Sequence, residues 1–144
     1  MLRRVAYLIP LVVMGSILLS ACGAGGQQSS KAKLAPVSAL PKQMQDAPVA
    51  VRTAYQFAVA NPEALKNVPC YCGCGAIGHK SNLACYVKEF GPDGKPVFDD
   101  HAMGCSICVD IAQDVMKMTG EGKAPETIRK QIVNTYGKFG PANQ

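Results

Sequence analysis

The clearest pattern of apolar and polar positions lies between residues 105 and 119. Its apolar face carries Cys105, Cys108, Ile111, Ala112 and Val115, and its polar face carries Ser106, Asp110, Gln113, Asp114 and Lys117. This spacing predicts an amphipathic helix, which Gly120 ends. A last helix is predicted from Pro125 to Tyr136, with Ile128, Ile132 and Tyr136 facing inward and Gly137 as its stop.

Two shorter helices are predicted upstream. Residues 48–60 are helix-compatible, with Val51, Tyr55 and Ala58 on one side and Arg52, Thr53 and Gln56 on another. Asn61 can end this helix and Pro62 can open the next, which we expect over residues 62–67. Residues 69–81 contain three glycines and no sustained periodicity, so they predict a loop that folds around something.

The stretch from Leu83 to Phe98 fits two structures. Leu83, Tyr86, Val87 and Phe90 are spaced i, i+3, i+4 and i+7, as in a short helix that Gly91 ends. The turn residues at 91–94 instead favour a hairpin that pairs 86–90 with 95–98. In either case we expect a mainly α fold: a small single helical domain with a cysteine- and glycine-rich loop and, in the second case, one short β-hairpin.

The first 21 residues have the three parts of a secretory signal peptide, with Arg3 and Arg4 before an apolar run and small residues at its end. The run is too short for a membrane-spanning helix, which needs about 20 apolar residues. Leu19-Ser20-Ala21-Cys22 resembles the lipobox of bacterial lipoproteins. We therefore expect cleavage before Cys22 and acylation of this cysteine, which would anchor the chain to a membrane.

These expectations divide the chain into a signal peptide (1–21), a lipid-anchored flexible tether (22–45) and a cysteine-rich helical domain (46–144). The tether prediction depends mainly on residues 23–33, which have almost nothing to bury. The mature protein is expected outside the cytoplasm, held at the cell membrane. Gly23 is not the aspartate that commonly retains lipoproteins at an inner membrane, so in a host with two membranes the outer membrane is also open to it.

The charge of the mature chain argues against a nucleic-acid partner. Removing the signal peptide takes Arg3 and Arg4 from the fifteen basic side chains and leaves 13 against 10 acidic ones, with no basic block. The membrane, reached through the lipid on Cys22, is therefore the partner that the sequence indicates.

Six cysteines remain once Cys22 is lipidated. Cys70, Cys72 and Cys74 form Cys-x-Cys-x-Cys, Cys85 stands alone, and Cys105 and Cys108 form Cys-x-x-Cys. An even set in an exported protein first indicates disulfides, with fifteen possible pairings. Cysteines two positions apart cannot readily bridge each other, so each of the first three would need one of the last three as its partner.

The same spacing favours a metal site. Thiols alternating with glycine suit a chain that curls until several thiolates meet at one soft ion. Cys105 and Cys108 begin a helix, whose dipole favours thiolate over thiol. Two histidines flank the cysteine groups and complete the predicted ligand set, which is Cys70, Cys72, Cys74, Cys85, Cys105, Cys108, His79 and His101. The Met103 thioether would also suit Cu(I), although a core or surface role explains it more simply.

Among metals the sequence favours Cu(I). Zinc is a weaker choice, because structural zinc sites usually have two Cys-x₂₋₄-Cys arms and only Cys105 and Cys108 have that spacing. Iron–sulfur assembly is usually cytoplasmic, which argues against a cluster of that kind. Covalent c-type haem is excluded, because Val109 stands where its Cys-x-x-Cys-His motif requires histidine.

Pro69-Cys70-Tyr71-Cys72-Gly73-Cys74-Gly75 resembles the name-giving motif of the PCYCGC-motif bacterial lipoproteins. Gly78-His79, Cys85 and the stretch from His101 to Ala112 are also similar to that family, and the resemblance covers roughly residues 51–136 plus the lipobox. It implies an extracytoplasmic lipoprotein in which both cysteine groups belong to one module. These proteins are largely uncharacterised, so the metal prediction rests on the residues themselves.

Three functions follow as hypotheses. The favoured one is a non-enzymatic, lipid-anchored protein that captures, stores or transfers Cu(I), with a partner protein for transfer. A second is a thiol–disulfide oxidoreductase that uses Cys105 and Cys108, although the βαβ context that normally presents such a pair is missing. A third is a binding module that disulfides hold together.

Overall fold

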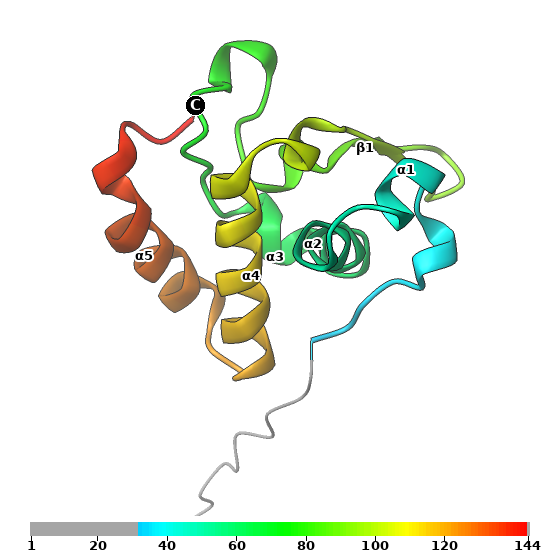
Figure 1. Ribbon diagram of the computed structural model, residues 1–144. Helices are drawn as coiled ribbons and strands as arrows, with labels where there is room; N and C mark the ends of the chain where they lie inside the picture. Colours follow the sequence, from blue (N-terminus) through cyan, green and yellow to red (C-terminus); the bar gives the residue numbers. More distant parts are fainter. Residues whose placement is uncertain (1–31, 144) are drawn as a thin grey trace, which may run out of the picture.

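Helix α4 (Ser106–Gly120) lies between α2 (Val49–Ala60) and α5 (Pro125–Tyr136) in the computed structural model, which describes residues 32–143 (Figure 1). Its buried side chains are Cys108, Val109, Ile111, Ala112, Val115 and Met118. Four of them, Cys108, Ile111, Ala112 and Val115, belong to the predicted apolar face, and Val109 and Met118 are buried in addition. Cys105, the fifth predicted member of that face, caps the helix and is only half-buried. The predicted helix is therefore confirmed, displaced by one residue at each end.

Helix α5 has the predicted bounds and buries Ile128, Ile132 and Tyr136 against the rest of the core. Its first residue is Pro125, which needs no backbone donor there. The Tyr136 hydroxyl donates a hydrogen bond of 2.9 Å to Asp114 Oδ2 and so ties the end of α5 to α4.

The remaining elements are short. They are α1 (Lys42–Gln45), α3 (Pro62–Lys66), β1 (Val87–Phe90), β2 (Pro96–Phe98) and the 3₁₀ turns η1 (Val37–Ala39), η2 (Gly75–Ile77), η3 (Leu83–Cys85), η4 (His101–Met103) and η5 (Gly137–Phe139). Helix α2 buries Ala54, Tyr55, Phe57 and Ala58. The mainly α fold with one small hairpin is confirmed, and Met103 packs half-buried against the core.

Between Leu83 and Phe98 the hairpin is the correct structure and the longer helix is wrong. Strands β1 and β2 pair antiparallel with Val87 opposite Phe98 and Phe90 opposite Pro96. Gly94 closes the turn with φ +74°, a conformation that glycine adopts without steric cost. Only η3 remains of the helical alternative, and it directs the buried Cys85 into the core.

The packed domain begins earlier than the predicted boundary at residue 46. Leu40 and Met44, which lie within the predicted tether, are only 3% and 1% exposed. Two hydrogen bonds join Gln56 on α2 to Ala35. The Gln56 side-chain amide donates to the Ala35 carbonyl, and the Ala35 amide donates to the Gln56 carbonyl. This segment contains prolines and short helical turns, so its apolar residues have no regular period. It nevertheless covers one side of α2 (Figure 1). The predicted signal peptide, Cys22 and most of residues 23–33 lie outside the described residues.

No helix between residues 32 and 143 has the length and apolar content needed to cross a bilayer.

Candidate metal centre

The PCYCGC segment forms the loop that rises beside the start of α4 (Figure 1). Gly73 at φ +77° and Gly78 at φ +94° make its two sharp turns, in a backbone region that other residues rarely adopt. The His79 amide donates to the Cys74 carbonyl at 3.3 Å. The loop therefore curls back on itself and returns His79 to the cysteines.

Two elements, η3 and the start of α4, meet beneath this loop. The buried Cys85 comes from η3, the N-cap Cys105 precedes α4, and the buried Cys108 lies in the first turn of that helix. The Sγ atom of Cys108 lies 3.1 Å from that of Cys105 and 3.4 Å from that of Cys70. The loop and the helix thus bring their sulfur atoms into direct contact.

All eight predicted ligand residues gather in three overlapping groups, within each of which the ligand atoms lie no more than 4.8 Å apart. The inner group is Cys70, Cys72, Cys85 and Cys108; the outer group is Cys72, Cys74, His79 and His101; the third is His101, Cys105 and Cys108. Thiolates around one tetrahedral ion at about 2.3 Å would lie about 3.8 Å apart. Small side-chain movements would close any of these groups on a metal.

Cys72, Cys108 and His101 each belong to two groups. Such sharing is typical of clusters in which one thiolate bridges two ions. Each group could hold a metal ion, and the donors of the three groups together are mainly soft sulfur.

The buried thiols of the inner group shift one another's pKa values. Hydrogen bonds from Cys108 and Cys85 hold the pKa of Cys70 far below its ordinary range. The same contact with Cys70 raises the pKa of Cys108, and the contact with Cys85 and burial add to that rise. The hydrogen bond between Cys85 and Cys108 lowers the pKa of Cys85. The hydrogen bond between Cys85 and Cys70, together with burial, has a larger effect and raises the pKa of Cys85. Because a metal binds the thiolate form of cysteine, ligation by these residues would release protons.

The outer group adds two imidazoles. The His101 Nε2 atom lies 3.5 Å from Cys74 Sγ, and the two histidine rings meet edge to face at 4.7 Å. His79 is 5% exposed; its Nε2 lies 3.5 Å from Asp99 Oδ2, and its buried Nδ1 has no hydrogen-bond partner within the described residues. A carboxylate behind one ring nitrogen leaves the other as a ligand, as is common in metal sites.

A protein-family model described as "Protein of unknown function with PCYCGC motif" matches residues 11–143. The chain belongs to this family. Comparison with curated proteins and with solved structures gave no match. In this PCYCGC protein, the three cysteines of the name-giving motif divide between the groups: Cys70 lies in the inner one, Cys74 in the outer one, and Cys72 in both.

The PCYCGC site contains three further residues that sequence reasoning missed. Asn82 is fully buried, donates to the Cys108 carbonyl at 3.1 Å and lies 3.7 Å from Cys70 Sγ. Asn143 donates from its side chain to Cys72 Sγ at 3.2 Å. Asp99 faces His79 and also accepts a hydrogen bond from the His101 amide at 2.8 Å. Asp99 could have been predicted from its position two residues before His101, whereas nothing in the spacing of the sequence points to either asparagine.

No two of the six described cysteines form a disulfide, and all six are free thiols. Their closest sulfur atoms are 3.1 Å apart, against about 2.05 Å in a disulfide. For the oxidoreductase interpretation, the sheet of the described part of this PCYCGC protein is a two-stranded antiparallel hairpin, not the βαβ unit that usually presents a redox-active pair.

Proposed function

We propose that this protein binds Cu(I) in its thiolate and imidazole cluster on the outer side of a bacterial membrane, where lipid on Cys22 anchors it. There it captures, stores or hands on the ion. The observation that carries the proposal is the gathering of six cysteines and two histidines, from three separate segments, into overlapping groups of ligand distance.

The choice of Cu(I) rests on the donor set. Sulfur outnumbers imidazole nitrogen in the cluster, and soft thiolates select Cu(I) over harder ions. The third group offers only three ligands, and Cu(I) accepts such low coordination and shares thiolates between ions. Burial of Cys70, Cys85 and Cys108 would also shield a bound Cu(I) from oxidation.

Zinc is the second candidate, and one observation favours it. Cys70, Cys72, Cys85 and Cys108 form a four-sulfur group, and tetrahedral four-sulfur sites are typical of structural zinc. In that case the ion would stabilise the fold and would not be cargo.

Metal content tests the proposal. The full chain is expressed in a bacterium grown with added copper and zinc, purified from its membranes, and analysed for bound metals and free thiols together. We expect copper, with few reactive thiols, and its loss in Cys72→Ser. Tyr71→Phe is the matched control, because it changes the neighbouring loop residue and leaves every sulfur in place. Three disulfides and no metal would refute the proposal, and bound zinc alone would establish the second candidate.

The anchor has its own test. Cys22→Ala leaves the signal peptide and the domain unchanged but removes the acylated thiol. We expect the unaltered chain in the membrane fraction carrying a fatty-acid label, and the variant without this label. Equal labelling of both chains would refute lipidation at Cys22.

A further inference from the structure

The inner and outer groups differ in depth and in chemistry. Three members of the inner group, Cys70, Cys85 and Cys108, are fully buried and all its donors are sulfur. In the outer group Cys72, Cys74 and His101 are only half-buried, and half of the donors are imidazole. An ion in the outer group therefore lies nearer to solvent and is held by less soft ligands.

The outer group is bordered by the open side of the loop. A side chain placed at Gly73 or Gly78 would meet no atom within 4 Å. Ile77, at the end of the turn between them, is 69% exposed. This turn directly follows Cys74 in the sequence. Another molecule can therefore approach Cys74 without displacing the core.

Cys72 joins the two groups. It is the one residue that they share. Asn143 holds it from the C-terminal side by donating to its Sγ at 3.2 Å, and the same residue fixes the loop through the carbonyls of Cys70 and His79, both at 2.9 Å. The sulfur of Cys72 is thereby kept between the two sets of ligands.

Building on the proposed function, we propose that the cluster works as two positions in series. The outer group, Cys72, Cys74, His79 and His101, is an exchange position, where Cu(I) arrives from or leaves to a thiolate-bearing donor or acceptor. The inner group, Cys70, Cys72, Cys85 and Cys108, is the holding position. Cys72 stays bound to the ion while the other ligands are replaced.

The transfer is a ligand exchange without redox change. Cu(I) keeps its charge throughout. A bond to the donor's thiolate breaks as a bond to Cys74 forms, and the proton of the Cys74 thiol passes to the departing donor, which leaves as a thiol. The bonds to Cys74 and the imidazoles then give way to bonds with the inner sulfurs, and the protons of those thiols pass to water. Softer and drier surroundings favour the inner position.

The matched variants are Cys74→Ala and Cys85→Ala, because each removes one sulfur from one of these two groups and neither belongs to the third. Reduced full chain in detergent is titrated anaerobically with Cu(I) held by a chromogenic Cu(I) chelator. The affinity for the tightest ion and the rate at which excess chelator removes it are both measured. Ile77→Ala serves as the control for changes in the loop.

We expect Cys85→Ala to lower the affinity for the tightest Cu(I) ion by about 100-fold, while the chelator removes the ion at least as fast as from the unaltered chain. Cys74→Ala should keep the affinity within about threefold but slow removal by about tenfold or more, since a rate falls tenfold for each 1.36 kcal/mol added to a barrier. If Cys85→Ala fails to fold, the removal rate of Cys74→Ala tests the scheme by itself.

Two results would overturn the two-position scheme while leaving Cu(I) binding intact: equal loss of affinity in Cys74→Ala and Cys85→Ala, or removal from Cys74→Ala at the rate of the unaltered chain. Failure of the unaltered chain to take up Cu(I) would instead refute the proposed function itself.

Discussion

The Sγ atoms of Cys70 and Cys108, 38 positions apart in the sequence, lie 3.4 Å from each other in the core. This contact joins the PCYCGC loop to the first turn of α4. It is longer than a disulfide bond of about 2.05 Å, and the hydrogen bond lowers the pKa of Cys70 and raises that of Cys108. We therefore expect these two sulfur atoms either to be oxidised to a disulfide or to bind a metal together.

Metal should protect these thiols. In the metal-free protein, a mild oxidant is expected to link Cys108 to Cys70 or to Cys105, because both neighbours are within 3.4 Å and need only small movements. In the loaded protein the sulfurs are ligands, and we expect alkylation by iodoacetamide to slow by about tenfold or more. Peptide mapping after timed alkylation measures this. Equal alkylation rates with and without metal would contradict thiolate ligation.

Asn82 should matter for both the fold and the site. Its side chain donates to the Cys108 carbonyl and lies 3.7 Å from the Cys70 sulfur. Asn82→Ala removes these contacts and leaves a small void, so the free energy of unfolding should fall by about 1–3 kcal/mol. Metal affinity should fall by about tenfold, as for other residues that support a ligand. Denaturant unfolding and metal titration measure the two effects. Asn134→Ala, on the exposed face of α5, is the control and should change neither.

The long helices could be predicted because each has one apolar face that the core buries, as Ile128 and Ile132 show on α5. The hairpin could be named only as an alternative, since Tyr86, Val87 and Phe90 also fit a helical period and the turn decides between them. Chemical type and spacing alone single out the eight candidate ligand residues. Their division into groups was not predictable, because it depends on contacts between distant segments.

The residues before position 46 show a different limit of sequence reasoning. Leu40 and Met44 lie in a stretch that Pro36 and Pro41 interrupt, and its apolar residues follow neither a helical nor a strand period. They are buried because α2 leaves one side open to them, a property of the tertiary structure.

Truncation tests this boundary. Deleting residues 32–45 should expose the apolar surface that Leu40 and Met44 cover and lower the free energy of unfolding by about 3–6 kcal/mol, at about 1.5–3 kcal/mol for each large side chain. Deleting residues 23–31 should change it by less than about 0.5 kcal/mol. Thermal and denaturant unfolding of the two shortened chains provide the comparison. Equal stability of the two would show that the segment is dispensable for folding.

Two buried phenols should make the protein sensitive to alkaline pH. Burial raises the pKa of Tyr55, helped by the charges of Asp99 and Asp100, and burial likewise raises the pKa of Tyr86. In the unfolded chain both titrate near pH 10. Their contribution to stability is therefore complete below about pH 10 and is lost as the pH rises above that value, because only the unfolded chain can release these protons.

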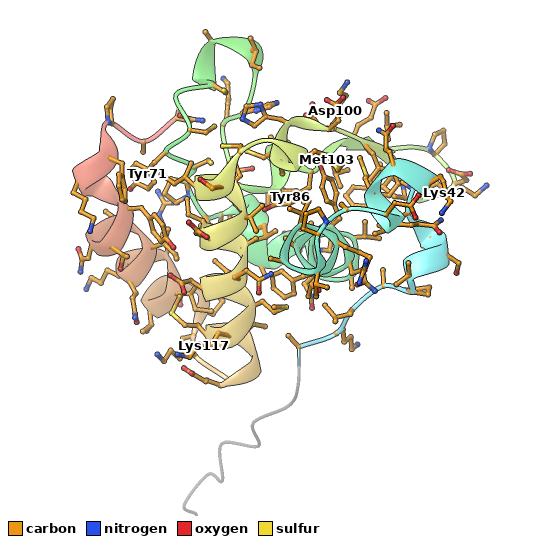
Figure 2. The ribbon with its side chains drawn as sticks, viewed as in Figure 1. Lys42, Tyr71, Tyr86, Asp100, Met103 and Lys117 are labelled. Carbon is orange, nitrogen blue, oxygen red and sulfur yellow. The ribbon has the colours of Figure 1, made fainter. Side chains whose placement is uncertain are left out.

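The loss of stability should reach the metal centre. The Tyr86 hydroxyl donates to the Cys108 carbonyl at 2.8 Å, and the Tyr55 hydroxyl donates to the Asp99 carbonyl at 2.8 Å, so both phenols hold the backbone of the site. Figure 2 shows Tyr86 beside α4, toward α2, and its ring packs edge to face on Tyr55. We expect phenolate absorbance from these two residues to appear only together with cooperative unfolding and with release of bound metal. Tyr86→Phe should lose the hydroxyl bond, at a cost of about 1 kcal/mol near neutral pH, and shift alkaline unfolding to higher pH. Gradual titration of both tyrosines in a protein that stays folded and metal-loaded would contradict this account.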